Sequence, residues 1–595
     1  MKKKIAIVVA ISMVAVSLSF VTQAKELSLF DTDREALTQQ PPEVAFWIWT
    51  DKYVYTPGEQ ITLKGTIKTN GDLNPYTLVV YRQNNQTGVR TYFPNNNTEV
   101  TDFYGRTNLD LFGINHLFDA TKATIIGPGG SLAFNVTAPN ELGMHTWVVE
   151  IRDFTGYRVV KTAYFKIGVV SGFETLQGNI EADQTLVNTK AYRLTGVVFV
   201  RNNAVLTIEP GTFIIGQPGS QPASSLIVTQ TGKIRALGTR SRPIIFTSSL
   251  PFGQRKAGDW GGVILLGSAP VNWPTGFGNI EGLTASDDTR YGGNNAAHDC
   301  GTLEYVRIEY AGAEFQPNNE INALTFGGCG TGTTVHHVQT RYGLDDMFEW
   351  FGGTMDAKYL VGAYARDDYI DVQIGWTGRL QHILAVAGRD VPGNRGFEFD
   401  NNELDFGATP NSTPKIFNVT MVGVGDTLTQ GSDEGESVAG AWLRRGTGGS
   451  FNNIVLFNWI ANGFTIRDEA TMGAVDRGEL TLNGLLMWDN GKASGKTNTL
   501  NGQTSGSSNL ALPFLSGQRG QARNVLVVNP RMRRPLEFSD PDFRPDLGSP
   551  LWRANWVQPP DDGFFDQWAR WTGAFGDEDW TEEWTCFHVE ADIAP

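Results

Sequence analysis

Two segments of this chain repeat at a spacing of 22 residues, and this spacing constrains the fold more than any other feature of the sequence. Residues 342–350 align with residues 364–372, and both contain apolar residues at alternate positions. The acidic positions that coincide are Asp345 with Asp367, Asp346 with Asp368, and Glu349 with Asp371. A third copy, residues 396–401, follows a short insertion and brings Glu398 into the series. A period in the low twenties with alternating apolar residues indicates strands stacked coil upon coil.

A second strand pattern recurs eight times between residues 305 and 528, at intervals of 22 to 41 residues. The copies begin at Tyr305, His337, Tyr359, His382, Asn418, Asn453, Asn483 and Asn524. Variable intervals are expected when each coil has constant strands and one turn carries loops of different length. The sequence therefore predicts an all-β protein whose main part, residues 175–545, is a long right-handed parallel β-helix.

The N-terminal part of the chain has a different pattern. Residues 1–24 combine three lysines, an apolar run and small residues before a cleavage point after Ala24, which is typical of a secretory signal peptide. Residues 25–42 are polar and end in two prolines, so we interpret them as a lead-in. Residues 43–169 contain about seven short alternating strands, which predicts a β-sandwich. Residues 50–59 within it resemble the opening strand and turn of macroglobulin-like and immunoglobulin-like domains.

Charge and hydropathy restrict the partners. The formal net charge of −15 becomes −18 when the three lysines of the signal segment are removed. The electrostatic field of a chain with this negative charge repels phosphate backbones and anionic membranes, so nucleic acid is not an expected partner. No apolar run after the signal segment is long enough to span a bilayer. We expect a secreted protein that is periplasmic, extracellular or on the cell surface, with no transmembrane segment.

The chain contains three cysteines. Cys300 and Cys329 are about one coil apart, so a disulfide between neighbouring coils is compatible with an oxidising compartment. Spacing alone does not establish that pairing. Cys586 would then remain unpaired.

Several motifs resemble one bacterial family. They are residues 258–270, 319–328, 346–354 and 443–447, together with the aromatic run 564–584. The chain is similar to secreted or surface β-helix proteins with a pectate-lyase-like fold, such as leptospiral outer-membrane lipoproteins. The resemblance implies fold and export. The lipidated cysteine of the lipoproteins has no counterpart near Ala24, so their membrane anchor does not carry over.

The repeats also fix side-chain directions. If Ile370 and Val372 point inward, Asp371 points outward, and by register so do Glu349 and Glu398. Adjacent strands lie about 4.8 Å apart, so these carboxylates form a column on one external face. The same alternation predicts that Asp400 also points outward and that Arg444 and Arg467 follow it in the next coils. Trp442 lies beside these two arginines in the sequence pattern. These predicted ligand-binding residues are Asp400, Trp442, Arg444 and Arg467.

Like charges at this spacing disfavour ionisation unless something offsets them. A bound Ca²⁺, neighbouring arginines, or raised pKa values used in catalysis would each do so. The predicted metal-binding residues are Asp345, Asp346, Glu349, Asp367, Asp368, Asp371 and Glu398. The candidate catalytic residues are Glu349, Asp371, Glu398, Arg444 and Arg467. Aspartates at turns also commonly accept hydrogen bonds from backbone amides, which is the alternative for Asp345, Asp346, Asp367 and Asp368.

Three functions remain open at this stage. The face suits binding of a polysaccharide or another surface polymer, through Ca²⁺ and arginine. A carbohydrate-active enzyme is the second reading, as a Ca²⁺-dependent lyase or a polygalacturonase-like hydrolase. Such hydrolases carry a Gly-His-Gly that this chain lacks, and His336, His337 and His382 are its only histidines expected near the face. A structural surface scaffold is the third reading.

The C-terminal residues 546–595 are rich in tryptophan. They either stack on sugars or cover the open end of the helix, whose last coil would otherwise expose unpaired strand edges. We interpret them as a C-terminal aromatic-rich cap.

Overall fold

The computed structural model describes residues 44–69, 77–92, 130–152, 159–220, 222–316, 319–389, 393–425, 439–491, 510–553 and 556–590. The predicted signal peptide and lead-in lie outside these ranges. No helix of the described chain is long and apolar enough to cross a membrane.

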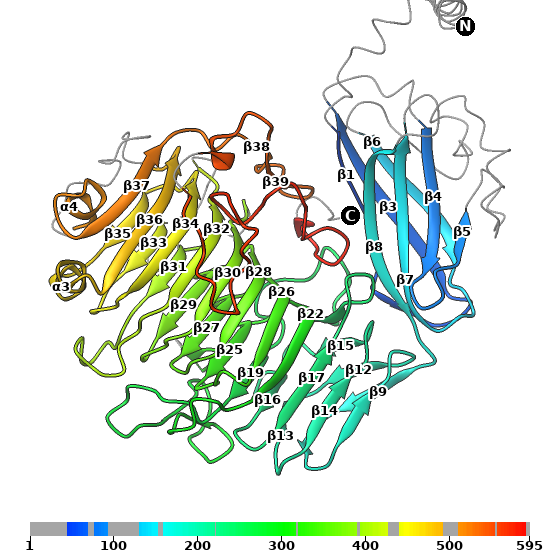
Figure 1. Cartoon of the computed structure of the whole chain (residues 1–595). Helices are drawn as coiled ribbons and strands as arrows, with labels where there is room; N and C mark the ends of the chain where they lie inside the picture. Colours follow the sequence, from blue (N-terminus) through cyan, green and yellow to red (C-terminus); the bar gives the residue numbers. More distant parts are fainter. Residues whose placement is uncertain are drawn as a thin grey trace, which may run out of the picture.

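Two small sheets form the N-terminal part. The first has the order β1 (Val44–Thr50), β3 (Gln60–Thr69), β6 (Gly130–Thr137). The second has the order β2 (Val54–Tyr55), β8 (Val159–Val169), β7 (Gly143–Arg152), β4 (Thr77–Asn84), β5 (Arg90–Tyr92). Their apolar residues share one core, in which Phe46, Trp147 and Phe165 are buried. This is the predicted β-sandwich. The same core includes Phe213 and Phe252 of the following part, so the sandwich packs directly against the β-helix (Figure 1).

The remainder is the predicted right-handed parallel β-helix, seen in Figure 1 as a stack of parallel strands from β9 to β37. One parallel sheet runs β10 (Asn179–Ile180), β13 (Val197–Val200), β16 (Ser225–Val228), β19 (Gly262–Leu266), β25 (Leu324–Gly327), β27 (Phe348–Phe351), β29 (Ile370–Gln373), β31 (Arg395–Phe399), β33 (Ala439–Leu443), β35 (Asn462–Ile466). We call it the ten-stranded sheet.

The long sheet faces it across the core. Its main path is β9 (Phe173–Leu176), β12 (Ala191–Leu194), β15 (Phe213–Gly216), β18 (Ile244–Ser248), β22 (Gly301–Glu309), β26 (Thr334–Arg341), β28 (Asp356–Ala363), β30 (Arg379–Val386), β32 (Lys415–Val422), β34 (Gly449–Phe457), β36 (Leu480–Trp488), β37 (Gln521–Val527). Three further strands of the same sheet lie off this path and pair in the order β11 (Gln184–Leu186), β14 (Val205–Ile208), β17 (Lys233–Leu237), and β17 joins the main path at β22. Short two-stranded pairs join β20 (Gly278–Asn279) to β21 (Arg290–Tyr291) and β23 (Glu314–Gln316) to β24 (Asn319–Glu320).

The eight recurring strand segments of the sequence all lie in this long sheet, as consecutive neighbours from β22 to β37. Their first residues are not strand starts, because each strand begins several residues earlier. In seven of the eight copies that residue has positive φ, for example 56° at His337 and 57° at Asn418, and in β36 the next residue, Gly484, takes the role. Asparagine adopts this left-handed conformation more easily than most residues.

The left-handed positions also stack. The rings of Tyr305, His337, Tyr359 and His382 lie in parallel, with centroids 4.3, 4.4 and 4.6 Å apart from one to the next. The histidines therefore belong to an aromatic ladder on the long sheet and do not lie near the acidic column, which is on the other sheet.

Cys300, directly before β22, is bonded to Cys329, two residues after β25, with their Cα atoms 5.9 Å apart. Cys586 is free and buried. Between β36 and β37 lies α4 (Ala511–Leu515), which packs against β35 and β37, while α3 (Glu469–Arg477) packs against β36.

The C-terminal residues 530–553 and 556–590, which we call the strap, do not lie over the end of the helix. They include β38 (Met532–Arg534), β39 (Asp542–Pro545) and η5 (Pro550–Trp552), and they return along the outer face of the long sheet toward the sandwich (Figure 1). Asn453 and Asn418 donate to strap carbonyls at Val557 and Trp571, and Gln339 to that of Cys586. The physical reason is the polar ladder on that face, whose side chains need partners once they are covered.

Asn418 should hold the strap on the long sheet. It is fully buried, and its amide donates to the carbonyls of Trp571 and Gly573 at 2.9 and 3.3 Å. In Asn418→Ala, two strap carbonyls lose this donor, which should speed amide hydrogen exchange in strap peptides about tenfold to hundredfold. Asn524→Ala is the matched control, because Asn524 has the same left-handed backbone but is exposed and donates to Asn483 instead. Equal exchange in the two variants would contradict this role.

Candidate functional site

One row of outward side chains crosses the ten-stranded sheet. The register pairs Thr325 with Glu349, Glu349 with Asp371, Asp371 with Glu398, and Glu398 with Trp442. The neighbours of these residues in each strand, such as Phe348 and Ile370, point into the core. The row is therefore the column that the 22-residue spacing predicts, with Trp442 as its next member.

The row is not an external face, contrary to the expectation from the sequence. Glu349 and Glu398 are each 3 % exposed, and Asp371 is half-buried. Neighbouring amides provide the cover, since Asn322 donates to Glu349 and Gln373 Nε2 donates to Glu349 Oε1 at 2.7 Å. The site is a buried polar layer with a half-exposed rim. The rim residues are Asp345, Asp367, Asp371, Arg444 and Arg467.

Three carboxylates form what we call the acidic centre: Asp346, Glu349 and Asp371. One oxygen from each lies within 4.8 Å of the others. Asp371 Oδ1 is buried and has no hydrogen-bond partner within the described ranges. No arginine or lysine forms an ion pair with these three groups in the described part of the chain. An oxygen-only set of this kind is what hard divalent cations such as Ca²⁺ prefer.

A second carboxylate group overlaps the first. Asp345, Asp346 and Asp367 also bring one oxygen each within 4.8 Å of one another. Their turns carry structural hydrogen bonds as well: Asp346 Oδ1 accepts from the backbone amide of Asp368 at 2.9 Å, and Asp367 Oδ1 accepts from Asn394 at 2.8 Å. The turn capping expected as the alternative for these aspartates is therefore present at Asp346 and Asp367, and cation binding by this group stays a prediction.

Arginines neutralise the rest of the row. Arg395 pairs with Asp368 at 3.0 Å and with Glu398. Arg444 pairs with Glu398 and, at 2.8 Å, with Asp400. Asp368 and Glu398 thus separate from the acidic centre, although the sequence analysis grouped them with it. The reason is Arg395, which opens β31 three residues before Glu398 and reaches both carboxylates.

Trp442 does not present a ring face to a ligand. It is 2 % exposed, and its ring lies between the guanidinium groups of Arg395 and Arg467, at 3.9 and 4.2 Å from the ring centroid. Trp442, which the sequence predicts as a ligand-binding residue, is instead engaged in cation–π packing with both arginines. Arg467 itself forms no ion pair with a carboxylate of the described chain.

Burial and mutual repulsion shift the protonation of the acids. Burial, and next to it the neighbouring carboxylates, raise the pKa values of Asp346, Glu349 and Asp371 well above the usual range. Burial raises the pKa of Asp367 to about 6 and that of Asp400 to about 7. The three groups of the acidic centre therefore hold protons to higher pH than free carboxyls do when no cation is present.

Arg395, Asn322 and Arg445 are site residues that the sequence analysis did not identify. Arg445 pairs with Asp400 at 2.6 Å. The arginine at residue 445 directly follows the predicted Arg444, which is a signal that could have been used. Asn322 gives no comparable signal, because it comes from the turn before β25, in the preceding coil.

Comparison with known proteins supports the fold. A protein-family model described as a pectate-lyase-like beta helix domain matches residues 178–513, over half of the 595-residue chain. No curated protein matches the sequence. Among solved structures, the Yersinia enterocolitica family 28 exopolygalacturonase matches at 11 % identity, covering 76 % of this chain and 96 % of that chain, with a TM-score of 0.19. That score is too low to support an argument about activity. With the match across its coils, the chain belongs to the pectate-lyase-like β-helix family.

Proposed function

We propose that this is an exported or cell-surface protein that binds an acidic polysaccharide along the ten-stranded sheet, through a Ca²⁺ ion at the acidic centre and through Arg467. The observation that carries the proposal is the group of three carboxylates, Asp346, Glu349 and Asp371, which form no ion pair within the described chain. Pectate-lyase-like proteins are typically extracellular or surface proteins, which agrees with the predicted signal segment.

The acidic centre is costly for the fold unless it is neutralised. Two buried carboxylates and a half-buried one, with oxygens within 4.8 Å of one another, repel one another and lose hydration. Protons or a divalent cation are the two ways to remove that charge. The amides of Asn322 and Gln373 fix both oxygens of Glu349, and such outer contacts commonly orient metal ligands. Asp371 is half-buried, so a bound cation would keep a side open to an acidic sugar.

Arg467 supplies a second contact for an anionic ligand. Its guanidinium is half-exposed, is held over the Trp442 ring, and is not paired with a carboxylate in the described residues. Three strand intervals separate Asp371 in β29 from the strand end that carries Arg467, which corresponds to roughly 14 Å at about 4.8 Å per interval. A ligand that reaches both groups is therefore extended, as a polymer is.

Catalysis is the second candidate, and one observation favours it. Burial raises the pKa values of Glu349 and Asp371, which lie side by side on neighbouring strands, so either carboxyl can hold a proton at a pH where a free carboxyl has lost it. Glycoside hydrolysis uses such pairs, with one acid and one base. Incubation with polyuronates should then release reducing ends or unsaturated products, and both signals should vanish in Glu349→Gln.

Cation binding can be tested directly. We expect Ca²⁺ to bind the full mature protein with a dissociation constant in the micromolar to millimolar range, measured by isothermal titration calorimetry. Asp371→Asn should weaken binding at least tenfold, because it removes one of three charged ligands. Glu403→Gln is the control, since Glu403 is exposed and its one ion pair in the described chain is with Arg445, at 3.7 Å. Unchanged binding in Asp371→Asn would exclude the acidic centre.

The acidic centre also predicts a pH dependence of stability. Unfolded carboxyls ionise near pH 4, whereas the folded pKa values of Asp346, Glu349 and Asp371 are raised. The native state therefore binds more protons above pH 4, so its stability must fall as pH rises toward those folded pKa values. In chelator, the free energy of unfolding should decrease between pH 5 and pH 8. Ca²⁺ should flatten this slope, and a slope of opposite sign would contradict it.

Arg467 should govern affinity for the polymer. Arg467→Ala should weaken binding of polygalacturonate about tenfold or more in Ca²⁺, because a charge-assisted contact is lost. Arg523→Ala removes an exposed arginine of β37 and should leave binding unchanged. Affinity electrophoresis or calorimetry measures the difference. Absence of polymer binding by the unaltered protein, with Ca²⁺ bound normally, would leave the acidic centre as a structural metal site and support the scaffold reading.

A further inference from the structure

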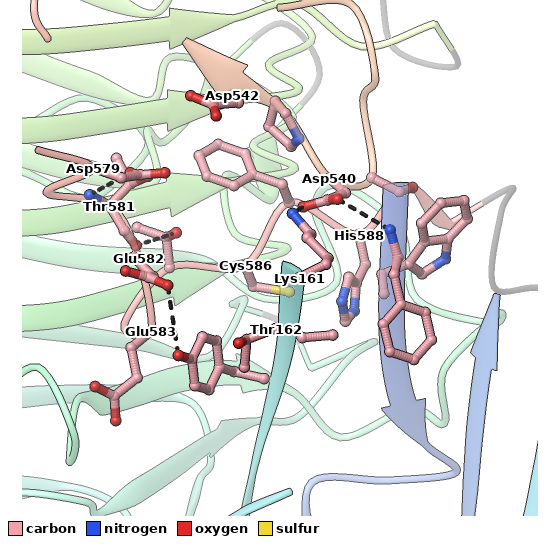
Figure 2. Close-up of a pocket in the computed structure, with 18 of the residues that line it drawn as sticks. Lys161, Thr162, Asp540, Asp542, Asp579, Thr581, Glu582, Glu583, Cys586 and His588 are labelled. Carbon is pink, nitrogen blue, oxygen red and sulfur yellow. Dashed lines mark hydrogen bonds and ion pairs between the residues drawn. The ribbon is translucent and has the colours of Figure 1, made fainter. Parts of the chain in front are cut away.

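A cavity of about 300 Å³ lies where the sandwich, the β-helix and the strap meet (Figure 2). Its lining comes from β8 of the sandwich, from Arg307 of β22, and from two strap segments around Asp540 and Cys586. Lys161 of β8 pairs with Asp540 at 2.6 Å, and Lys166 pairs with Glu583 at 3.3 Å. These contacts hold the walls together.

Cys586 is fixed at the inner wall. Gln339 of β26 forms two hydrogen bonds with its backbone, at 2.8 and 2.9 Å, and Arg341 donates to the carbonyl of His588 at 2.6 Å. The side chain of Arg341 also lies against the sulfur, with Nη1 to Sγ at 3.4 Å. Cys586 is 6 % exposed and belongs to the cavity lining.

The buried charges around the sulfur do not balance without a thiolate. Arg255, Arg307 and Arg341 are buried guanidiniums, whereas the nearby carboxylates are Glu309 and Glu590. The phenols that face the same cluster, Tyr53 and Tyr310, have pKa values raised by burial and are neutral. Although burial alone raises it, Arg341 and then His588 lower the pKa of Cys586 to about 6. A thiolate supplies the missing negative charge.

A second buried polar group faces the same space. His588 is 6 % exposed, its Nδ1 has no hydrogen-bond partner in the described chain, and its ring stacks on Phe165 at 5.8 Å. Figure 2 shows the imidazole of His588 beside the sulfur of Cys586 among the lining residues. An unpartnered buried nitrogen can bond to a small polar molecule that enters the cavity.

We propose that Cys586 is a modification site whose thiolate reacts with small hydroperoxides that enter the junction cavity. The sulfur attacks one oxygen of the peroxide, the O–O bond breaks, and the leaving hydroxide or alkoxide takes a proton from solvent. The sulfur is oxidised to a sulfenic acid while the peroxide is reduced to water or an alcohol. Cys300 and Cys329 are bonded to each other and do not compete.

The test uses the full mature protein under native conditions. With hydrogen peroxide and dimedone, intact-mass analysis should show one sulfenic-acid adduct per chain, absent without peroxide and absent in Cys586→Ser. With iodoacetamide, the thiolate should displace iodide with a rate that is half-maximal near pH 6, instead of about 8.5 for an unperturbed thiol. This profile needs no variant that disturbs the fold. An adduct that forms only after denaturation, or a half-maximum above about pH 8, would overturn the proposal.

Discussion

Parallel hydrogen bonding between successive coils is the constraint on which the rest of this structure depends. It places each residue over the residue one coil earlier, at about 4.8 Å. Wherever the sequence repeats, residues of the same chemical type therefore stack on one another in neighbouring coils. Apolar residues and aromatic rings gain from that arrangement, as the ladder from Tyr305 to His382 shows. Carboxylates lose from it, and the row from Glu349 to Glu398 has to be neutralised coil by coil.

The two ends of that row are neutralised in different ways. At β31 an arginine enters the repeat, and Arg395 and Arg444 compensate Asp368, Glu398 and Asp400 inside the protein. The sequences of β27 and β29 contain no arginine, and within the described chain the hydrogen bonds to Glu349 come from the amides of Asn322 and Gln373. The stability of the first group is built into the chain, whereas that of the second depends on protons or on a cation from solution. A site that depends on solution composition is where binding or catalysis is expected.

Much of this could be predicted from the sequence, because local alternation and a fixed period determine register. The 22-residue spacing placed Glu349, Asp371 and Glu398 in one row, and alternation placed Arg444 next to Asp400. Burial could not be predicted in the same way. Asn322 and Gln373 cover the carboxylates from other turns, and the insertion before β31 carries Arg395. The route of the strap depends on still longer separations, such as the 247 residues between Gln339 and Cys586.

The strap provides hydrogen-bond partners for polar side chains on the outer face of the long sheet. Outward amides and rings at the left-handed positions would bond to water if the sheet were bare. Once the strap covers them, each needs a partner from it, and Asn418 and Asn453 find backbone carbonyls there. The strap then reaches the sandwich, where Asp540 accepts from Lys161 and from the backbone amide of Phe46. Because one segment satisfies both the ladder and the sandwich, a loss of strap contacts at one end weakens the junction at the other. The cavity at Cys586 lies at that shared point, so chemistry on its sulfur acts where the sandwich, the strap and the coils meet.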